Sequence, residues 1–109
     1  MNPDLPTYRV ELTEAAEAEV DSAYLYRLRY SPESAHQWHT EFLRAISSLE
    51  QLPHRFPPVE SQVPDFSIRR MMIGRGGSQC HAVFRIIEPQ NGEEGIVRIL
   101  HVRSAFLPE

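Results

Sequence analysis

Two helical patterns follow one another along this chain with almost no linker between them. In the first, Ala16, Val20 and Ala23 recur at helical spacing after Thr13, which can cap the helix; we expect this helix to end near Tyr30. A new helix then starts at a serine followed by proline, which suits the first helical position. Its apolar stripe is broad: Ala35, Trp38, Phe42, Ala45, Ile46, Leu49 and Leu52. We therefore expect an antiparallel helical hairpin whose shared apolar side needs a sheet to cover it.

Strand patterns lie on both sides of this hairpin. Tyr8, Val10 and Leu12 alternate with polar residues, as in a strand with one buried face. Beyond the helices a proline-rich segment interrupts regular structure, and three strand-like runs follow it: Ser67–Ile73, Gln79–Ile87 and Gly95–Arg103. The sequence predicts an α+β fold of order β-α-α-β-β-β. The hairpin covers one face of a curved, mainly antiparallel four-stranded sheet, and the other face is open.

Length and composition fit one soluble domain spanning residues 1–109. A chain of 109 residues can fill one hydrophobic core, and no apolar run approaches the length of a membrane helix, so we expect a cytoplasmic protein. The single cysteine, Cys80, offers neither a disulfide nor a zinc-ligand spacing, and we expect it in the core with no metal or cofactor.

Charge is unevenly distributed. The formal net charge of −4 argues against a protein that holds nucleic acid by general attraction to phosphates. Yet residues 66–87 contain four arginines and no acid, and all eleven basic side chains of the chain are arginine. We expect arginines from the late strands to line the open face of the sheet, opposite an acidic helix side. Glu14, Glu17, Glu19 and Asp21 then form a solvated helix face.

Strand alternation assigns individual residues to the open face. Arg69 and Arg70 are adjacent, so only one of them can point to that face, and the sequence does not choose between them. His81 and Arg85 share a face, since the alternate positions of their strand are apolar. In the last strand, Val97, Ile99, His101 and Arg103 oppose Ile96, Leu100 and Val102, so His101 and Arg103 should be neighbours. Trp38 falls in the helix stripe and is expected in the core, and residues 74–77 are expected to form a hairpin turn and not a phosphate loop.

From residue 8 to about residue 103 the chain resembles the RelE/ParE toxin superfamily. The resemblance lies in the order and spacing of five segments: Tyr8–Ala16, Ala35–Pro53, Ser67–Met71, His81–Ile86 and Val97–Arg103. It implies the toxin of a type II toxin–antitoxin system, of the kind also called plasmid stabilisation proteins. The implied partners are a cognate antitoxin that forms a hetero-oligomer with the toxin, and as target either DNA gyrase or the ribosome with its messenger RNA.

Members of the superfamily act in two ways. RelE-like proteins cut messenger RNA on the ribosome, and ParE-like proteins poison gyrase. Cleavage needs a proton acceptor, a proton donor and cations that stabilise the charged phosphorane. This chain has no lysine, and Ser104 stands where many members carry a late histidine. We therefore favour a ParE-like toxin that acts by binding.

Three interpretations stay open from the sequence. A binding toxin would use Arg69, Arg70, His101 and Glu60 to contact its target, and whether the protein is an enzyme is left open. A nuclease would use His81, Arg85 and Arg103 as catalytic residues, with His101 as a second proton carrier and Glu60 as base. The third interpretation is a chain that keeps the fold and binds antitoxin but has lost toxicity.

Overall fold

A computed structural model describes residues 7–59, 67–74 and 79–104. Strand β1 (Tyr8–Leu12) leads into helices α1 (Glu14–Leu28) and α2 (Pro32–Ser47). Two short 3-10 helices follow, η1 (Ser48–Glu50) and η2 (Pro53–Arg55). The chain then forms strands β2 (Ile68–Ile73), β3 (Cys80–Ile87) and β4 (Gly95–Ser104).

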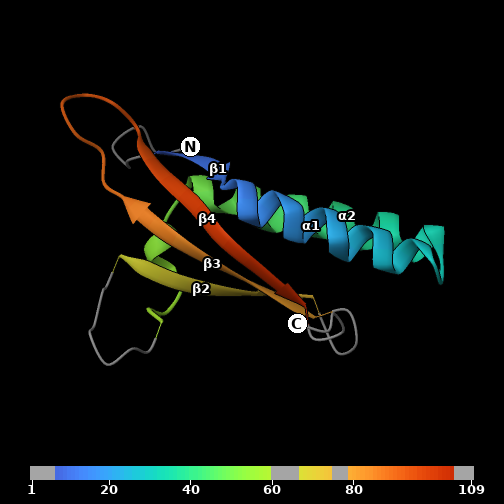
Figure 1. Cartoon of the computed structure of the whole chain (residues 1–109). Coiled ribbons are helices and arrows are strands. Elements are labelled where there is room, and N and C mark those ends of the chain that lie inside the picture. The colour runs from blue at the N-terminus through green and yellow to red at the C-terminus, as the bar shows by residue number, and fades with distance from the viewer. Residues whose placement is uncertain (1–6, 60–66, 75–78, 105–109) are drawn as a thin grey trace.

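The strands form one sheet in the order β1-β4-β3-β2. β1 runs parallel to β4, and the other two pairings are antiparallel, so the predicted meander of late strands is confirmed. Both helices lie on the same side of the sheet as an antiparallel hairpin, whose far end extends well beyond the strands (Figure 1). The predicted α+β architecture is therefore confirmed, with one covered face and one open face.

The helix boundaries follow from local chemistry. The Thr13 hydroxyl accepts a hydrogen bond from the Ala16 amide, and the Ser31 hydroxyl accepts one from Ser34, each satisfying an amide of the first turn. α2 ends at Ser47, earlier than its apolar stripe predicts. Leu52 has a left-handed backbone (φ 52°) and an exposed side chain, so its assignment to the stripe was wrong.

The core lies between the hairpin and the covered face of the sheet. Phe42, Leu49, Phe84, Val97 and Ile99 are completely buried there. Trp38 stacks on Phe42 with ring centroids 5.6 Å apart, and Cys80 is a free, buried thiol. The predicted core positions of Trp38 and Cys80 are confirmed.

A β-bulge changes the face assignment of β4. Phe84 of β3 pairs with Ile99, but the preceding residue, Val83, pairs with His101, so Leu100 is an extra residue in β4. Val97 and Ile99 therefore face the core before the bulge, and Val102 does so after it. The expectation that His101 and Arg103 share a face with Val97 and Ile99 was wrong, because simple alternation takes no account of the extra residue.

Candidate functional site: the open face of the sheet

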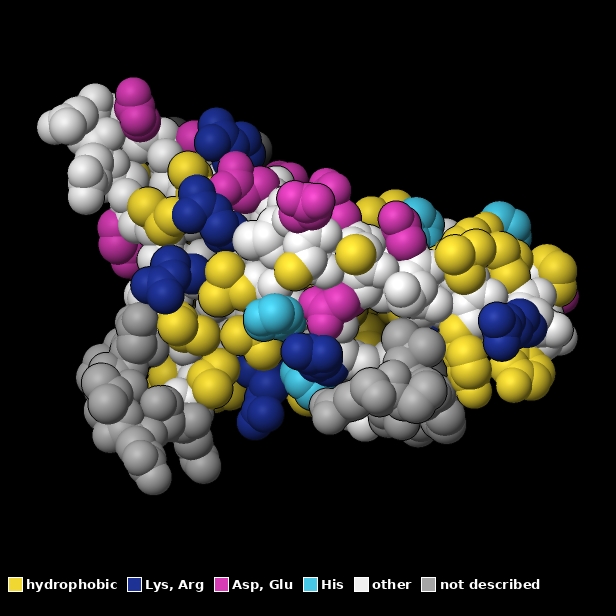
Figure 2. Space-filling model, viewed as in Figure 1, with side chains coloured by type: hydrophobic (Ala, Val, Ile, Leu, Met, Phe, Trp, Pro, Cys, Tyr) yellow, Lys and Arg dark blue, Asp and Glu magenta, His cyan; other side chains and the backbone are white. Residues whose placement is uncertain are grey.

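The open face carries a mixture of cations and hydrophobic side chains. Strand pairing places its members in rows across the sheet: Met72, His81 and Arg103 in one, Arg70, Val83 and His101 in the next, and Ile68, Arg85, Arg98 and Glu11 in a third. In Figure 2, arginine and histidine side chains gather over the strands with hydrophobic ones between them. As predicted, arginines of the late strands lie on this face: Arg70, Arg85, Arg98 and Arg103.

His81 lies close to two guanidinium groups, those of Arg70 and Arg103. It lies half-buried directly opposite Arg103 on β4. Burial lowers the pKa of His81, and the positive charges of Arg70 and Arg103 lower it further. Burial and the two nearby cations therefore favour the neutral ring, in which one nitrogen can accept a proton.

Glu19 of α1 reaches round the edge of the sheet to this face. Its carboxylate lies 3.2 Å from His101 Nδ1 and 3.1 Å from Arg103 Nη1, and it accepts a 3.0 Å hydrogen bond from the Val102 amide. The prediction that His101 and Arg103 are neighbours is confirmed. The prediction that Glu19 belongs to a solvated helix face was wrong. β1 ends at Leu12, so this stretch of β4 pairs with β3 on one edge and has no strand on the other, where Glu19 lies.

Most of the remaining cations of the face also have contacts. Arg98 Nε donates to Glu11 Oε1 at 2.7 Å, and Arg9 lies 3.7 Å from the other oxygen of the same carboxylate. Arg85 Nη1 lies 3.4 Å from the Ser67 hydroxyl. Arg70 is exposed, with no side-chain hydrogen bond or ion pair among the described residues. Arg70 is thus the guanidinium of the described open face that is most available to a partner.

Arg69 and Arg70 separate as strand geometry requires. Arg69 points to the covered side, where its Nη1 donates to the backbone carbonyls of Phe56 at 2.8 Å and His54 at 3.2 Å. These bonds fasten η2 and the residues after it to β2. A target-binding role for Arg69 stays a prediction, but its guanidinium already serves the fold. Glu60 lies outside the described residues.

A buried arginine on the covered side was not anticipated. Arg27 is only 9% exposed; its guanidinium lies 4.4 Å from the centre of the Trp38 ring and donates to Ala23 O and Ser104 Oγ, both at 3.2 Å. Burial lowers its pKa. Position 27 lies four residues after Ala23, so helical spacing places it on the apolar stripe of α1. That spacing is the sequence signal that could have identified Arg27 as buried.

A second polar cluster joins the start of β1 and the residue after β3 to η2. The Tyr8 hydroxyl donates to Glu88 Oε1 at 2.8 Å, and His54 Nε2 lies 2.8 Å from Glu88 Oε2. Burial and the bond to Glu88 raise the pKa of Tyr8 to about 12. Burial would raise the pKa of Glu88, but the bonds from Tyr8 and His54 lower it overall.

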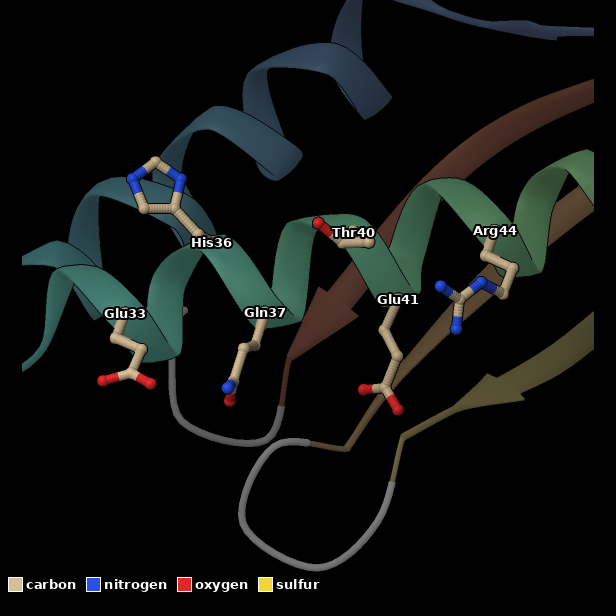
Figure 3. A pocket seen from close by; sticks show the side chains of 6 residues that line it. All are labelled: Glu33, His36, Gln37, Thr40, Glu41 and Arg44. Carbon is tan, nitrogen blue, oxygen red and sulfur yellow. The ribbon is translucent and has the colours of Figure 1, made fainter.

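The outer side of α2 carries a shallow hollow of about 550 Å³ (Figure 3). Its lining residues are Glu33, His36, Gln37, Thr40, Glu41 and Arg44, all from this one helix. A single helix encloses a ligand poorly, so this surface is a solvated helix side.

Two other kinds of site are missing from the described residues. They hold no group of three or more histidine, cysteine, aspartate or glutamate side chains placed to bind a metal ion. Within the same ranges, no helix has both the length and the apolar character needed to cross a bilayer.

Comparison with known proteins identifies the family. A family model described as the ParE toxin of type II toxin–antitoxin system, parDE, matches residues 10–106. A solved structure titled "Chromosomal ParDE TA system from P. aeruginosa" shares the fold, with a TM-score of 0.66 and 21% identity over 90% of this chain and 96% of that one. Among curated proteins no significant match is found. The chain belongs to the ParE toxin family of type II toxin–antitoxin systems.

Proposed function

We propose that this protein is a toxin that acts by binding DNA gyrase and is neutralised by a cognate antitoxin in a cytoplasmic hetero-oligomer. The observation that carries the binding mode is the position of Glu19. Its carboxylate contacts both His101 and Arg103, so two candidate groups for phosphate chemistry already have a partner within the chain. A surface with internally paired charges suits recognition of a protein partner better than phosphoryl chemistry.

The chemistry of RNA cleavage supports the same choice. Cleavage needs a proton acceptor at the 2′-hydroxyl and a proton donor at the leaving oxygen. Neutral His81 suits the first role. The other histidine of the described open face, His101, contacts Glu19 and is not opposite His81 in the register. A binding toxin requires no such pair of groups.

Exposed apolar side chains support an antitoxin partner. Leu25 and Tyr30, at the hairpin end of the helices, are 60% and 75% exposed. Contiguous exposed apolar surface marks interaction sites in soluble proteins, and a segment that folds on binding would cover it.

The test is inhibition of purified gyrase. We expect the protein to reduce supercoiling, and Arg70→Glu to weaken inhibition by about tenfold, because the reversal removes the open-face cation that has no internal partner among the described residues. Arg44→Glu, a reversal of the same kind on the outer side of α2, should inhibit like the unaltered protein. Undisturbed supercoiling at saturating toxin would refute gyrase as the target.

A ribosome-dependent messenger RNA nuclease is the second candidate, favoured by neutral His81 between Arg70 and Arg103. Translating ribosomes supplied with the protein would then yield cut messages. His81→Ala and Arg85→Ala should abolish the cuts, while Arg44→Ala should not. Intact messages would exclude this candidate, and inactivity in both assays would indicate a non-toxic antitoxin-binding protein.

A further inference from the structure

The strand edges of this sheet differ in whether other parts of the chain bond to their backbone groups. On the outer edge of β2, the Arg70 amide donates to Pro57 O at 3.1 Å and the Val59 amide donates to Ile68 O at 3.0 Å. On β4 beyond the end of β1, Thr13 Oγ1 donates to Leu100 O at 3.1 Å, and Glu19 accepts from Val102. Both edges are thus covered by the chain itself, as edges usually are in natural proteins.

The outer edge of β1 has no such cover among the described residues. The Gly95 amide donates to Thr7 O and the Thr13 amide donates to Ile99 O, so the odd-numbered residues of this segment direct their backbone groups to β4. Tyr8, Val10 and Leu12 therefore direct theirs outward. A hollow of about 350 Å³ lies beside this edge; residues 7–10 line it together with Glu50, Gln51 and Glu94.

The sequence along this edge is complementary to itself. In an antiparallel pairing centred on Val10, Val10 faces its own copy and Tyr8 faces Leu12 of the second copy. All of these residues direct backbone groups outward, so they form hydrogen-bonded pairs. Arg9 then faces Glu11 of the second copy at the intervening positions, where opposed side chains approach closely.

We propose that two copies of this chain associate through β1, antiparallel about a two-fold axis at Val10, to form one continuous sheet. The pairing joins opposite charges on the open face twice by symmetry, because Arg9 and Glu11 both project there. On the covered side it shields Val10 and Leu12, which are only partly buried in the single chain. This inference is independent of the proposed target.

The association is expected to be weak. A five-residue strand buries little surface, so a dissociation constant of about 1 to 100 µM is reasonable. Sedimentation velocity across that concentration range should show a monomer–dimer equilibrium of the full chain. A monomer at every concentration would overturn the proposal.

Charge reversal tests the register. Arg9→Glu places two carboxylates in opposition across the pairing, and Glu11→Arg places two guanidinium groups in opposition. Each variant alone should dimerise about tenfold more weakly, because the repulsion occurs twice. In a mixture of the two variants, one chain has glutamates at positions 9 and 11 and the other has arginines at both. Opposite charges then face each other at both positions, so a heterodimer should form. Failure of the mixture to associate, when the unaltered chain does, would contradict the register.

A backbone variant tests the edge itself. Val10→Pro removes an amide that points away from β4, so the β1–β4 ladder can stay intact, as prolines on edge strands allow. It should abolish the dimer, whereas Val10→Ala, which keeps the amide, should retain it. Circular dichroism checks that both variants fold.

Two further outcomes would overturn the proposal, one by pointing to another surface and one by pointing to another occupant of this edge. A dimer that survives Val10→Pro in a folded protein would use another surface and overturn the proposal. A chain that stays monomeric but binds a basic strand-forming peptide, which would fit Glu50 and Glu94 in the hollow, would assign the edge to a foreign strand and also overturn it.

Discussion

The two faces of the sheet use arginine in opposite ways. On the covered face, Arg27 and Arg69 donate to neutral acceptors, mainly backbone carbonyls, and hold separate elements together. On the open face, Arg98 and Arg103 pair with carboxylates in contact with water. Arginine therefore stabilises the fold on the covered face and forms solvent-exposed ion pairs on the open face.

The largest expected effect is on the covered face. Arg27→Ala removes the side chain that covers Trp38 and leaves Ser104 without its bond, so we expect a loss of about 2 to 4 kcal/mol of unfolding free energy in urea. Arg27→Met keeps the volume without a buried charge and should cost less than about 1.5 kcal/mol. Equal losses in the two variants would show that charge, and not packing, is what Arg27 supplies.

Glu19 lies between the two faces and should have an intermediate effect. Glu19→Ala leaves the Val102 amide without its acceptor and should cost about 1 to 2 kcal/mol. Glu19→Gln keeps an acceptor and should cost about half as much. Amide exchange at Val102 should speed up in the first variant; unchanged exchange would show that the carboxylate does not protect this edge.

Tyr8 should make the stability of the fold depend on pH in the alkaline range. Its pKa is raised to about 12, so the folded state retains a proton that the unfolded state loses near pH 10. Its contribution is complete below pH 10 and is lost as the pH rises towards 12. Tyr8→Phe should cost about 1 kcal/mol at neutral pH and flatten this alkaline decline. An equally steep decline in the variant would assign it to other groups.

The smallest effects belong to the open face. Arg98→Ala and Arg103→Ala should each cost less than about 1 kcal/mol, because exposed ion pairs contribute little. The loss should shrink further in about 0.5 M salt, where screening is strong. A salt-independent loss matching that of Arg27→Ala would erase the distinction between the faces.

The sequence predicted the fold well because its signals are local. Serine and threonine caps, the stripe through Trp38 and Phe42, and the alternation around Phe84 each act over a few residues. Those patterns determined the helical hairpin, the strand order along the chain and the placement of His81 and Arg85 on the open face.

The site was predicted less completely because its decisive contacts join distant residues. Glu19 and Val102 are separated by 83 positions, and Arg27 and Ser104 by 77. Neither pairing has a periodic signature. Both arise because β1 is shorter than β4, so α1 contacts the uncovered end of the longer strand.

The bulge at Leu100 has a consequence for how relatives of this protein are compared. Position 100 is an inserted residue, so residues before and after it follow opposite parities relative to the core. For a relative that lacks this extra residue, an alignment with the gap a few columns away would equate an interior valine of one toxin with a surface cation of the other. Mutational data transferred between family members across this strand should therefore be matched by structure, with the gap fixed at that residue.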